Sequence, residues 1–444
     1  MARDVQTYFH AVSDQLVGLL QKDEVLLGNF SAEESDFVRL NKNQVRQAGH
    51  VVQRAIGLEL IRGRRHAAAA ITLAGDLELD RPRLEQTVRE LRDRLASLPE
   101  DPHLLWSTEV RSSEKVGQRA LPPVEDALGE IRRAGEGKDL VGIYAAGGIH
   151  RGFMSSLGQR NWYSTWSFNF DWTFYHQKDK AVKEGYAGFR WDPAAFQRKV
   201  KLAGDKLGVL GRKARKIDRG QYRVYLSPVA VNELVHMMSW GGFGLKDHKT
   251  KQTPLLKMIE EGARLAPGVT LRENTAEGTA PNFQEQGFIR PDHVDLILGG
   301  AYKDCLVSPR SSKEYGVPTN GASAREAPLS VDMAAGQLAQ DQALAELGTG
   351  VWVGNLWYLN FSDRSSCRTT GMTRFATFWV EKGEIVAPLD VMRFDETIYR
   401  VLGSNLRGLT REREMLLDAQ TYEGRSTTSA HLPGALVEDF TFTL

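Results

Sequence analysis

The residues best suited to hydrolytic chemistry follow Ser227-Pro228, in an apolar stretch that predicts a helix over 229–238. Within it, Asn232-Glu233-Leu234-Val235-His236 has the spacing of the metal-binding sequence HExxH, but asparagine occupies the first position. A hydrolytic metal site on a helix needs two imidazoles on one face and a glutamate that takes a proton from bound water. Asparagine is a poor ligand for catalytic zinc, and no His-Glu pair occurs in the chain. We therefore expect no metal here. Glu233 and His236 remain as weak catalytic candidates, and His236 is expected to be packed and hydrogen-bonded.

Four arginines lie among the strands expected between residues 350 and 403 and are candidates for substrate binding: Arg364, Arg368, Arg374 and Arg393. A guanidinium can hold a peptide carboxylate through two parallel hydrogen bonds. The same residues could equally form structural ion pairs.

Other motifs are weaker. Cys367 and a histidine could form a nucleophilic pair, but a single cysteine near a turn is more often a small buried hydrophobe. The glycine-rich residues 348–354 run into a strand, whereas a dinucleotide-binding loop opens a helix. Residues 152–158 lack the GxSxG spacing of a nucleophile elbow. These motifs favour neither a nucleotide site nor a serine hydrolase.

Composition excludes several classes of protein. The 444 residues can form two or three domains, and 41% hydrophobic and 25% charged content is typical of a globular protein. A net charge of +1 gives no indication of nucleic-acid binding. No apolar run approaches the roughly 20 residues of a membrane span, and the first residues do not resemble a secretory signal. Two cysteines fit a reducing compartment, so we expect a cytoplasmic location.

The elements that position these residues can be predicted in outline. Residues 351–361 and 373–380 are expected to be strands, and Glu381-Lys382-Gly383-Glu384 predicts a tight hairpin turn. Asp395 is expected to cap a helix over 396–402, with Gly403 after its end. A longer helix is expected over 253–265, and a polar loop over 308–327.

The first part of the chain predicts helices around an antiparallel sheet. Residues 4–20 have an amphipathic helical pattern, and short strands are expected at 25–27, 36–40 and 45–60. Aromatic residues alternate through the strand expected at 161–176, which indicates an aromatic core or interface more than a peptide-binding wall. Residues 192–216 predict a helix with a basic, solvated face.

The C-terminal block carries a resemblance. Gly371-Met-Thr-Arg374, then Glu381-Lys-Gly-Glu-Ile385, Ala387-Pro-Leu389 and Val391-Met-Arg-Phe394 resemble the C-terminal signature of the TldD/PmbA family. The similarity extends in pattern from about Phe37 to the C-terminus. It implies a cytoplasmic, two-domain α+β protein acting in peptide degradation or maturation.

The resemblance also implies that the family has two kinds of subunit, of which only one binds a metal. TldD-type subunits carry HExxxH and a metal, and some complete the site with a cysteine near the C-terminus. The corresponding residues 422–429 contain no cysteine. The chain therefore resembles the TldE/PmbA branch, which implies no cofactor in this chain, zinc or iron in an HExxxH partner subunit, and a peptide substrate.

The sequence therefore predicts an α+β fold, with a helix-and-antiparallel-sheet domain over 1–215 and a β-rich domain with helices over 220–444. The first functional hypothesis is a metal-free subunit that pairs with the HExxxH subunit. The alternatives are a stand-alone peptide hydrolase with a repurposed site and a non-enzymatic, peptide-binding homodimer. No nucleic-acid or membrane partner is expected.

Overall fold

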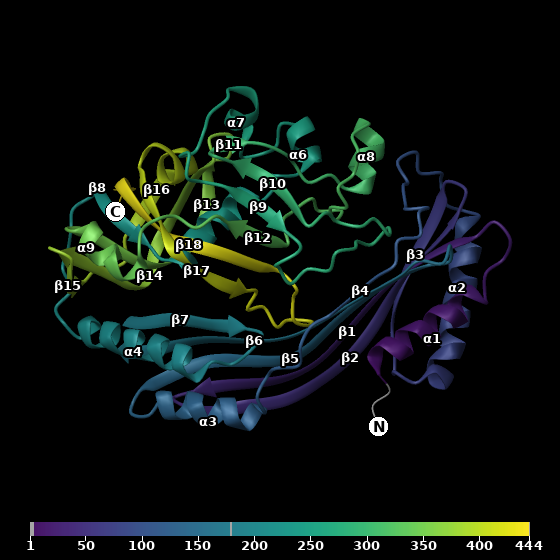
Figure 1. The fold of residues 1–444 in the computed structure, drawn as a ribbon, viewed down its shortest axis with the longest axis horizontal. Helices are drawn as coiled ribbons and strands as arrows, with labels where there is room; N and C mark the ends of the chain where they lie inside the picture. Colours follow the sequence, from purple (N-terminus) through teal and green to yellow (C-terminus); the bar gives the residue numbers. More distant parts are fainter. Residues whose placement is uncertain (1–3, 178–179, 444) are drawn as a thin grey trace.

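The computed structural model describes residues 4–177 and 180–443 and contains two sheets with flanking helices (Figure 1). The strands of the first sheet come from residues 25–188, and those of the second from residues 220–442. This arrangement confirms the predicted α+β class. The exact domain bounds, 1–215 and 220–444, stay a prediction.

The first sheet has the order β3-β2-β1-β5-β6-β4, and β7 pairs with β6. The pairing is antiparallel except between β4 and β6. Its strands are β1 (Val25–Asn41), β2 (Gln44–Arg62), β3 (Arg65–Thr72), β4 (Ser113–Val116), β5 (Asp139–Ser155), β6 (Arg160–Gln177) and β7 (Lys180–Gly188).

The second sheet has the order β11-β10-β9-β12-β18-β16-β14-β13-β8, with β15 beside β14 and β17 beside β18. Because β8 also pairs with β18, five of these strands close into a ring. The strands are β8 (Gly220–Leu226), β9 (Leu271–Asn274), β10 (His293–Leu298), β11 (Ala301–Tyr302), β12 (Ser330–Met333), β13 (Gly350–Asp363), β14 (Arg368–Glu381), β15 (Glu384–Pro388), β16 (Arg393–Thr397), β17 (Leu406–Leu417) and β18 (Ser429–Phe442).

The described helices are α1 (Val5–Val17), α2 (Leu77–Leu95), α3 (Val124–Ala134), α4 (Pro193–Leu210), α5 (Pro228–Ser239), α6 (Leu245–Lys249), α7 (Leu256–Glu260), α8 (Pro309–Tyr315), α9 (Ala343–Leu347), the 3₁₀ turn Gln340–Gln342 and the π turn Arg400–Ser404. Within the described residues, no helix is long and apolar enough to cross a membrane. The C-terminal half lies on one side of the long curved strands, and α1 and α3 lie on the other (Figure 1).

The alternating aromatic residues of β6 form the core beneath α3 and α4, as predicted. Phe168, Phe170, Trp172 and Phe174 are each at most 1% exposed. They pack with Phe196 of α4 in a single cluster that also takes in α3. Rings of this size each bury a large apolar area, so this face of the sheet is structural.

Two of the strands predicted near the N-terminus are one strand. Residues 25–27 and 36–40 both belong to the continuous strand β1. Its middle carries Glu33, Glu34 and Ser35, and these polar side chains interrupt the apolar alternation on which the prediction depended. The strand persists because backbone bonds to β2 and β5 hold it on both sides.

Three further predictions were wrong. The helix expected over 253–265 is only α7, because Gly262 takes a left-handed backbone with φ +69°. The loop expected over 308–327 contains α8, which Ser308 caps through the backbone N–H of Ser311. The helix expected over 396–402 forms only in part, as a helical turn over 398–404 that Asp395 does not cap. Asp395 lies inside β16, where its carboxylate pairs with Arg368 at 2.8 Å.

Candidate functional site

Helix α5 is fixed at its start by Ser227. The hydroxyl of Ser227 accepts a hydrogen bond from the backbone N–H of Ala230 at 3.2 Å and donates one to the carbonyl oxygen of Gly354 at 2.6 Å. The face turned toward the second sheet is buried and consists of Ala230, Val231, Leu234, Val235 and Met238. Asn232, Glu233 and His236 therefore share the less buried stripe of the helix.

Glu233 lies at the junction of the two sheets. Burial raises the pKa of the Glu233 carboxyl above its usual range, while His236 and Lys183 of β7 oppose that rise. Lys183 also pairs with Asp171 at 3.1 Å, and its Nζ lies 6.0 Å from the ring centroid of Phe375 on β14. A carboxyl with a raised pKa beside a cation can act as a general acid or base.

His236 differs from expectation. We predicted a packed and hydrogen-bonded imidazole, but the side chain is exposed. No hydrogen bond from its ring occurs within residues 4–177 and 180–443. The reason is helical geometry: Glu233 and His236 are three residues apart on the stripe that faces away from the core. The imidazole is therefore available to solvent or to a partner.

Two of the four candidate arginines are used internally. Arg364 donates to the carbonyl oxygens of Gln252 and Trp240, each at 2.7 Å, and so ties the turn between β13 and β14 to the segment after α5. Arg368 pairs with Asp395 across neighbouring strands. Arg368 thus forms a structural ion pair, the alternative given above, whereas Arg364 bonds to backbone carbonyl oxygens.

Arg374 and Arg393 have no hydrogen bond or ion pair from their side chains among the described residues. Arg374 stacks on Phe375 with its guanidinium carbon 5.4 Å from the ring centroid. Arg393 is exposed at the first position of β16. The structure thus separates the four arginines into two internal links and two cations that a ligand can reach.

Cys367 is buried, 2% exposed, in the turn that precedes β14. Burial raises the pKa of its thiol to about 12, with Arg364 opposing the rise. A thiolate is the reactive form of cysteine, and a raised pKa keeps this thiol protonated at neutral pH. Cys367 is therefore a small buried core residue, which is the more common role given for it in the sequence analysis.

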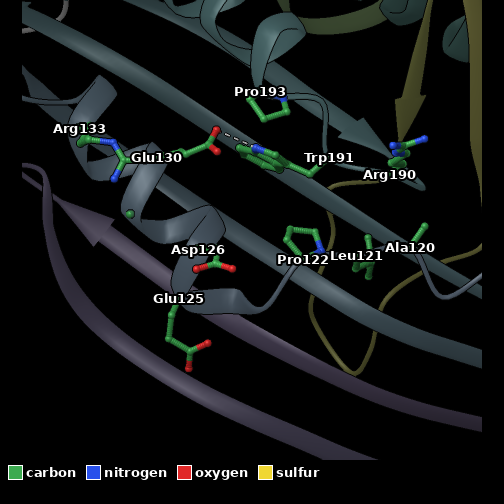
Figure 2. A pocket seen from close by; sticks show the side chains of 11 residues that line it. Ala120, Leu121, Pro122, Glu125, Asp126, Glu130, Arg133, Arg190, Trp191 and Pro193 are labelled. Atoms are coloured by element: carbon green, nitrogen blue, oxygen red, sulfur yellow. Dashed lines mark hydrogen bonds between the residues drawn. The ribbon is translucent and has the colours of Figure 1, made fainter.

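A cavity of about 640 Å³ lies between α3 and the start of α4 (Figure 2). Glu125, Asp126 and Glu130 line it together with Arg133 and Arg190. The indole N–H of Trp191 donates to Glu130 at 2.9 Å, as the dashed line in Figure 2 shows. The lining has no described histidine or cysteine.

A second cavity, about 460 Å³, lies between β1, β2 and the loop that follows β17. Glu423 and Gly424 of that loop line it opposite Arg39 and Gln53. The loop is held there because Gln53 donates to the carbonyl oxygen of Glu423 at 3.0 Å. This cavity lies where the C-terminal region meets the first sheet.

Residues 219–444 match the family model described as the PmbA/TldA metallopeptidase C-terminal domain, which covers just over half of the chain. The chain belongs to the TldD/PmbA family. No curated protein gives a significant match to this sequence.

The TldD/PmbA fold extends over the whole chain in solved structures. A putative modulator of a DNA gyrase from Thermotoga maritima matches with a TM-score of 0.79 and 14% identity, covering 98% of this chain and all of that one. TldE from Thermococcus kodakarensis matches with a TM-score of 0.77 and 14% identity, covering 98% of this chain and all of that one. A putative modulator of DNA gyrase from Bacteroides thetaiotaomicron matches with a TM-score of 0.74 and 15% identity, covering all of both chains. At these identities the matches show the fold.

The family is related to metallopeptidases, so the fit of a metal to this chain can be tested on its residues. Helix α5 offers one imidazole, one carboxylate and the amide of Asn232. Within residues 4–177 and 180–443, no three His, Cys, Asp or Glu side chains are grouped so that they could hold a metal ion. The side chains of α5 therefore do not fit a catalytic metal.

Sequence reasoning missed two residues at this junction. Lys183 acts on Glu233 from β7, and Arg425 inserts from the loop after β17 into the first sheet. The sequence marked neither, because each meets its partners only through long-range folding. The strand 180–188 also contains Lys180 and Glu184, so its residue types did not single out Lys183.

Proposed function

We propose that this chain is the metal-free, TldE/PmbA-like subunit of a two-part peptidase. It pairs with an HExxxH subunit that carries the zinc or iron, and the two enclose an extended peptide in the cytoplasm. The observation that carries the proposal is the stripe of α5, where Asn232, Glu233 and His236 occupy the position of a metal-binding motif without supplying its ligands. The likeness in fold to an archaeal TldE supports the same branch.

An aromatic surface near the end of α5 is the proposed contact with the catalytic subunit. Trp240, Trp357 and Tyr358 are 59%, 52% and 78% exposed. Scattered apolar residues are normal on a surface, but exposed aromatic residues that are close together mark interaction sites. The guanidinium of Arg364 lies over both Trp240 and Phe361, so it joins Trp240 to β13, the strand that also carries Trp357 and Tyr358.

The outer edge of β13 is the proposed place for the peptide. β8 pairs with β13 only through Val353, so from Asn355 onward the described residues place no strand on that edge. Extended peptides bind such edges through main-chain hydrogen bonds. Arg374, two residues before the core position Ala376, and the exposed Arg393 remain the candidates for the peptide carboxylate.

Co-expression with an HExxxH subunit tests the pairing. We expect the two chains to co-purify and to cleave a peptide that neither cleaves alone, and a chelator should abolish the cleavage. The double variant Trp357→Ser/Tyr358→Ser should weaken pairing at least tenfold. Leu79→Ser removes an equally exposed apolar residue from α2 (68% exposed) and should leave pairing unchanged.

The competing function is a stand-alone hydrolase, which the raised pKa of Glu233 favours. Under the pairing proposal, Glu233→Gln and His236→Ala alter neither complex formation nor its activity more than about twofold. Hydrolysis by this chain alone that disappears in Glu233→Gln would establish the competing function. A homodimer that binds peptide without cleaving it, and that excludes the HExxxH chain, would contradict both.

A further inference from the structure

A third cavity, about 250 Å³, lies on the helix-covered face of the first sheet, where the first residues of α1 and α3 approach one another. It is separate from α5, which packs against the second sheet. Its polar lining consists of Glu34, Asp36, His50, Arg119, His150 and Trp166. This set combines two carboxylates, one guanidinium and two imidazoles in a small volume.

His150 is the buried polar group of this cavity. The residue is 5% exposed, and its ring stacks on Trp162 and meets Trp166 edge-on. Neither ring nitrogen has a hydrogen-bond partner among the described residues, and Nδ1 is fully buried. Nε2 faces the cavity floor, since a methyl group added to Gly148 would lie 3.0 Å from it.

The protonation of His150 follows from its surroundings. Burial lowers the pKa of the imidazole to about 4, and Arg119 and Arg151 add to the effect. The ring is therefore neutral near pH 7, with one nitrogen that donates and one that accepts. A buried polar ring without a partner is costly to keep, and a ligand that reaches Nε2 would remove part of that cost.

Opposite charges face each other across the cavity. Glu34, Gly148 and Trp166 form one row across β1, β5 and β6, so Glu34 and Trp166 are separated by two strand spacings, roughly 10 Å. The guanidinium of Arg119 lies over Trp166, 4.5 Å from the ring centroid, and has no ion pair among the described residues. On the other side His50 bonds to Asp36 at 2.8 Å and approaches Glu34 at 3.9 Å.

We propose that this cavity binds a small zwitterion of the amino-acid class, either a free amino acid or a dipeptide. Its carboxylate pairs with Arg119, its ammonium group lies against Glu34 and Asp36, and the backbone or side chain between them bonds to His150 and stacks on Trp166. Gly148 leaves the floor open, because a Cβ atom at this position would lie 2.9 Å from Nε1 of Trp166 and 3.0 Å from Nε2 of His150. The inference does not depend on the proposed peptidase pairing.

Calorimetric titration of the full chain with phenylalanine and with glycyl-phenylalanine tests the site. The probe that binds more tightly shows whether the ligand is a free amino acid or a dipeptide. We expect one saturable site per chain. Phenylalanine amide, which lacks the carboxylate, and N-acetylphenylalanine, which lacks the ammonium, should each bind at least tenfold more weakly than phenylalanine.

Variants locate the binding. Arg119→Gln should weaken it at least tenfold, whereas Arg89→Gln, an exposed arginine on α2, should not change it. His150→Phe keeps an aromatic ring but removes the hydrogen bond, and it should weaken binding while far-ultraviolet circular dichroism confirms the fold. Absence of saturable binding for both probes, equal binding of the blocked analogues, or unchanged affinity in Arg119→Gln overturns the proposal.

Discussion

At the scale of single residues, Gly147 shows how closely β1 and β5 approach. A Cβ atom at this position would overlap the carbonyl oxygen of Glu34 and lie 2.6 Å from the Cα of Ser35. Its carbonyl oxygen also accepts a hydrogen bond from Arg425 at 3.3 Å. Backbone atoms cannot move aside as a flexible side chain can, so this position requires glycine.

We expect Gly147→Ala to lower the free energy of unfolding by about 2–3 kcal/mol, because overpacking forces the two strands apart. Urea denaturation followed by fluorescence measures the change. Gly185→Ala on β7 is the matched control, since no atom lies within 4 Å of its added Cβ. It should be neutral or slightly stabilising. Equal stability of the two variants would show that the strands can separate without cost.

At the scale of elements, Glu24 joins α2 and β2 to the turn between α1 and β1. It lies between α1 and β1 and accepts hydrogen bonds from Arg92 of α2 at 2.7 and 3.0 Å and from Arg62 of β2 at 2.7 Å. Burial alone would raise the pKa of Glu24, but the bonds from Arg92, the backbone of Gln21 and Arg62 outweigh it and lower the pKa to about 2.

This lowered pKa predicts acid sensitivity. Because the folded value lies below the ordinary 4.5, the stabilisation is complete above about pH 5 and is lost as the pH falls toward 2. The loss is on the order of 3 kcal/mol, since each pKa unit corresponds to about 1.4 kcal/mol. At pH 7 the Glu24→Gln variant should have a lower free energy of unfolding than the wild-type protein. Between pH 5 and pH 2 that free energy should fall less in the variant than in the wild-type protein. Denaturation curves at pH 7, 5, 4 and 3 measure both, and parallel pH profiles for the two proteins would contradict the prediction.

At the scale of the whole molecule, Arg425 connects the C-terminal region to the first sheet. The residue is 7% exposed, and its guanidinium donates to the hydroxyl and carbonyl oxygens of Ser167 at 2.7 and 2.9 Å. Its backbone N–H donates to Glu33 at 2.9 Å. Burial lowers the pKa of Arg425 to about 10, and the attraction of Glu33 opposes that fall, so the side chain stays charged at neutral pH.

Arg425→Met should cost about 3 kcal/mol of stability, because it removes a buried charge whose partners then remain without their donor. The loop over 418–428 should also become a preferred site of limited proteolysis. Tyr422→Ala, in the same loop but 85% exposed, should change stability by less than about 0.5 kcal/mol. Cleavage at equal rates in both variants would mean that the loop is held by other contacts.

The sequence by itself determined the features that depend on neighbours along the chain. The turn at Lys382-Gly383 and the alternation on either side predict the β14–β15 hairpin correctly, and Ser227 predicts the start of α5. It also determined which ligands α5 lacks, because a missing imidazole can be read directly from the residues. The α+β class follows from the same local periodicities.

Only the tertiary structure decided where distant residues meet. Asp395 became a strand residue because Arg368 lies across the ladder, and His236 became exposed because the core lies against the other face of α5. Arg425 reaches Glu33, almost 400 positions away, and Glu34, Arg119 and His150 come to line one cavity only through tertiary folding. Such contacts depend on strand pairing and loop closure across the whole chain, and no local pattern of residue types encodes them.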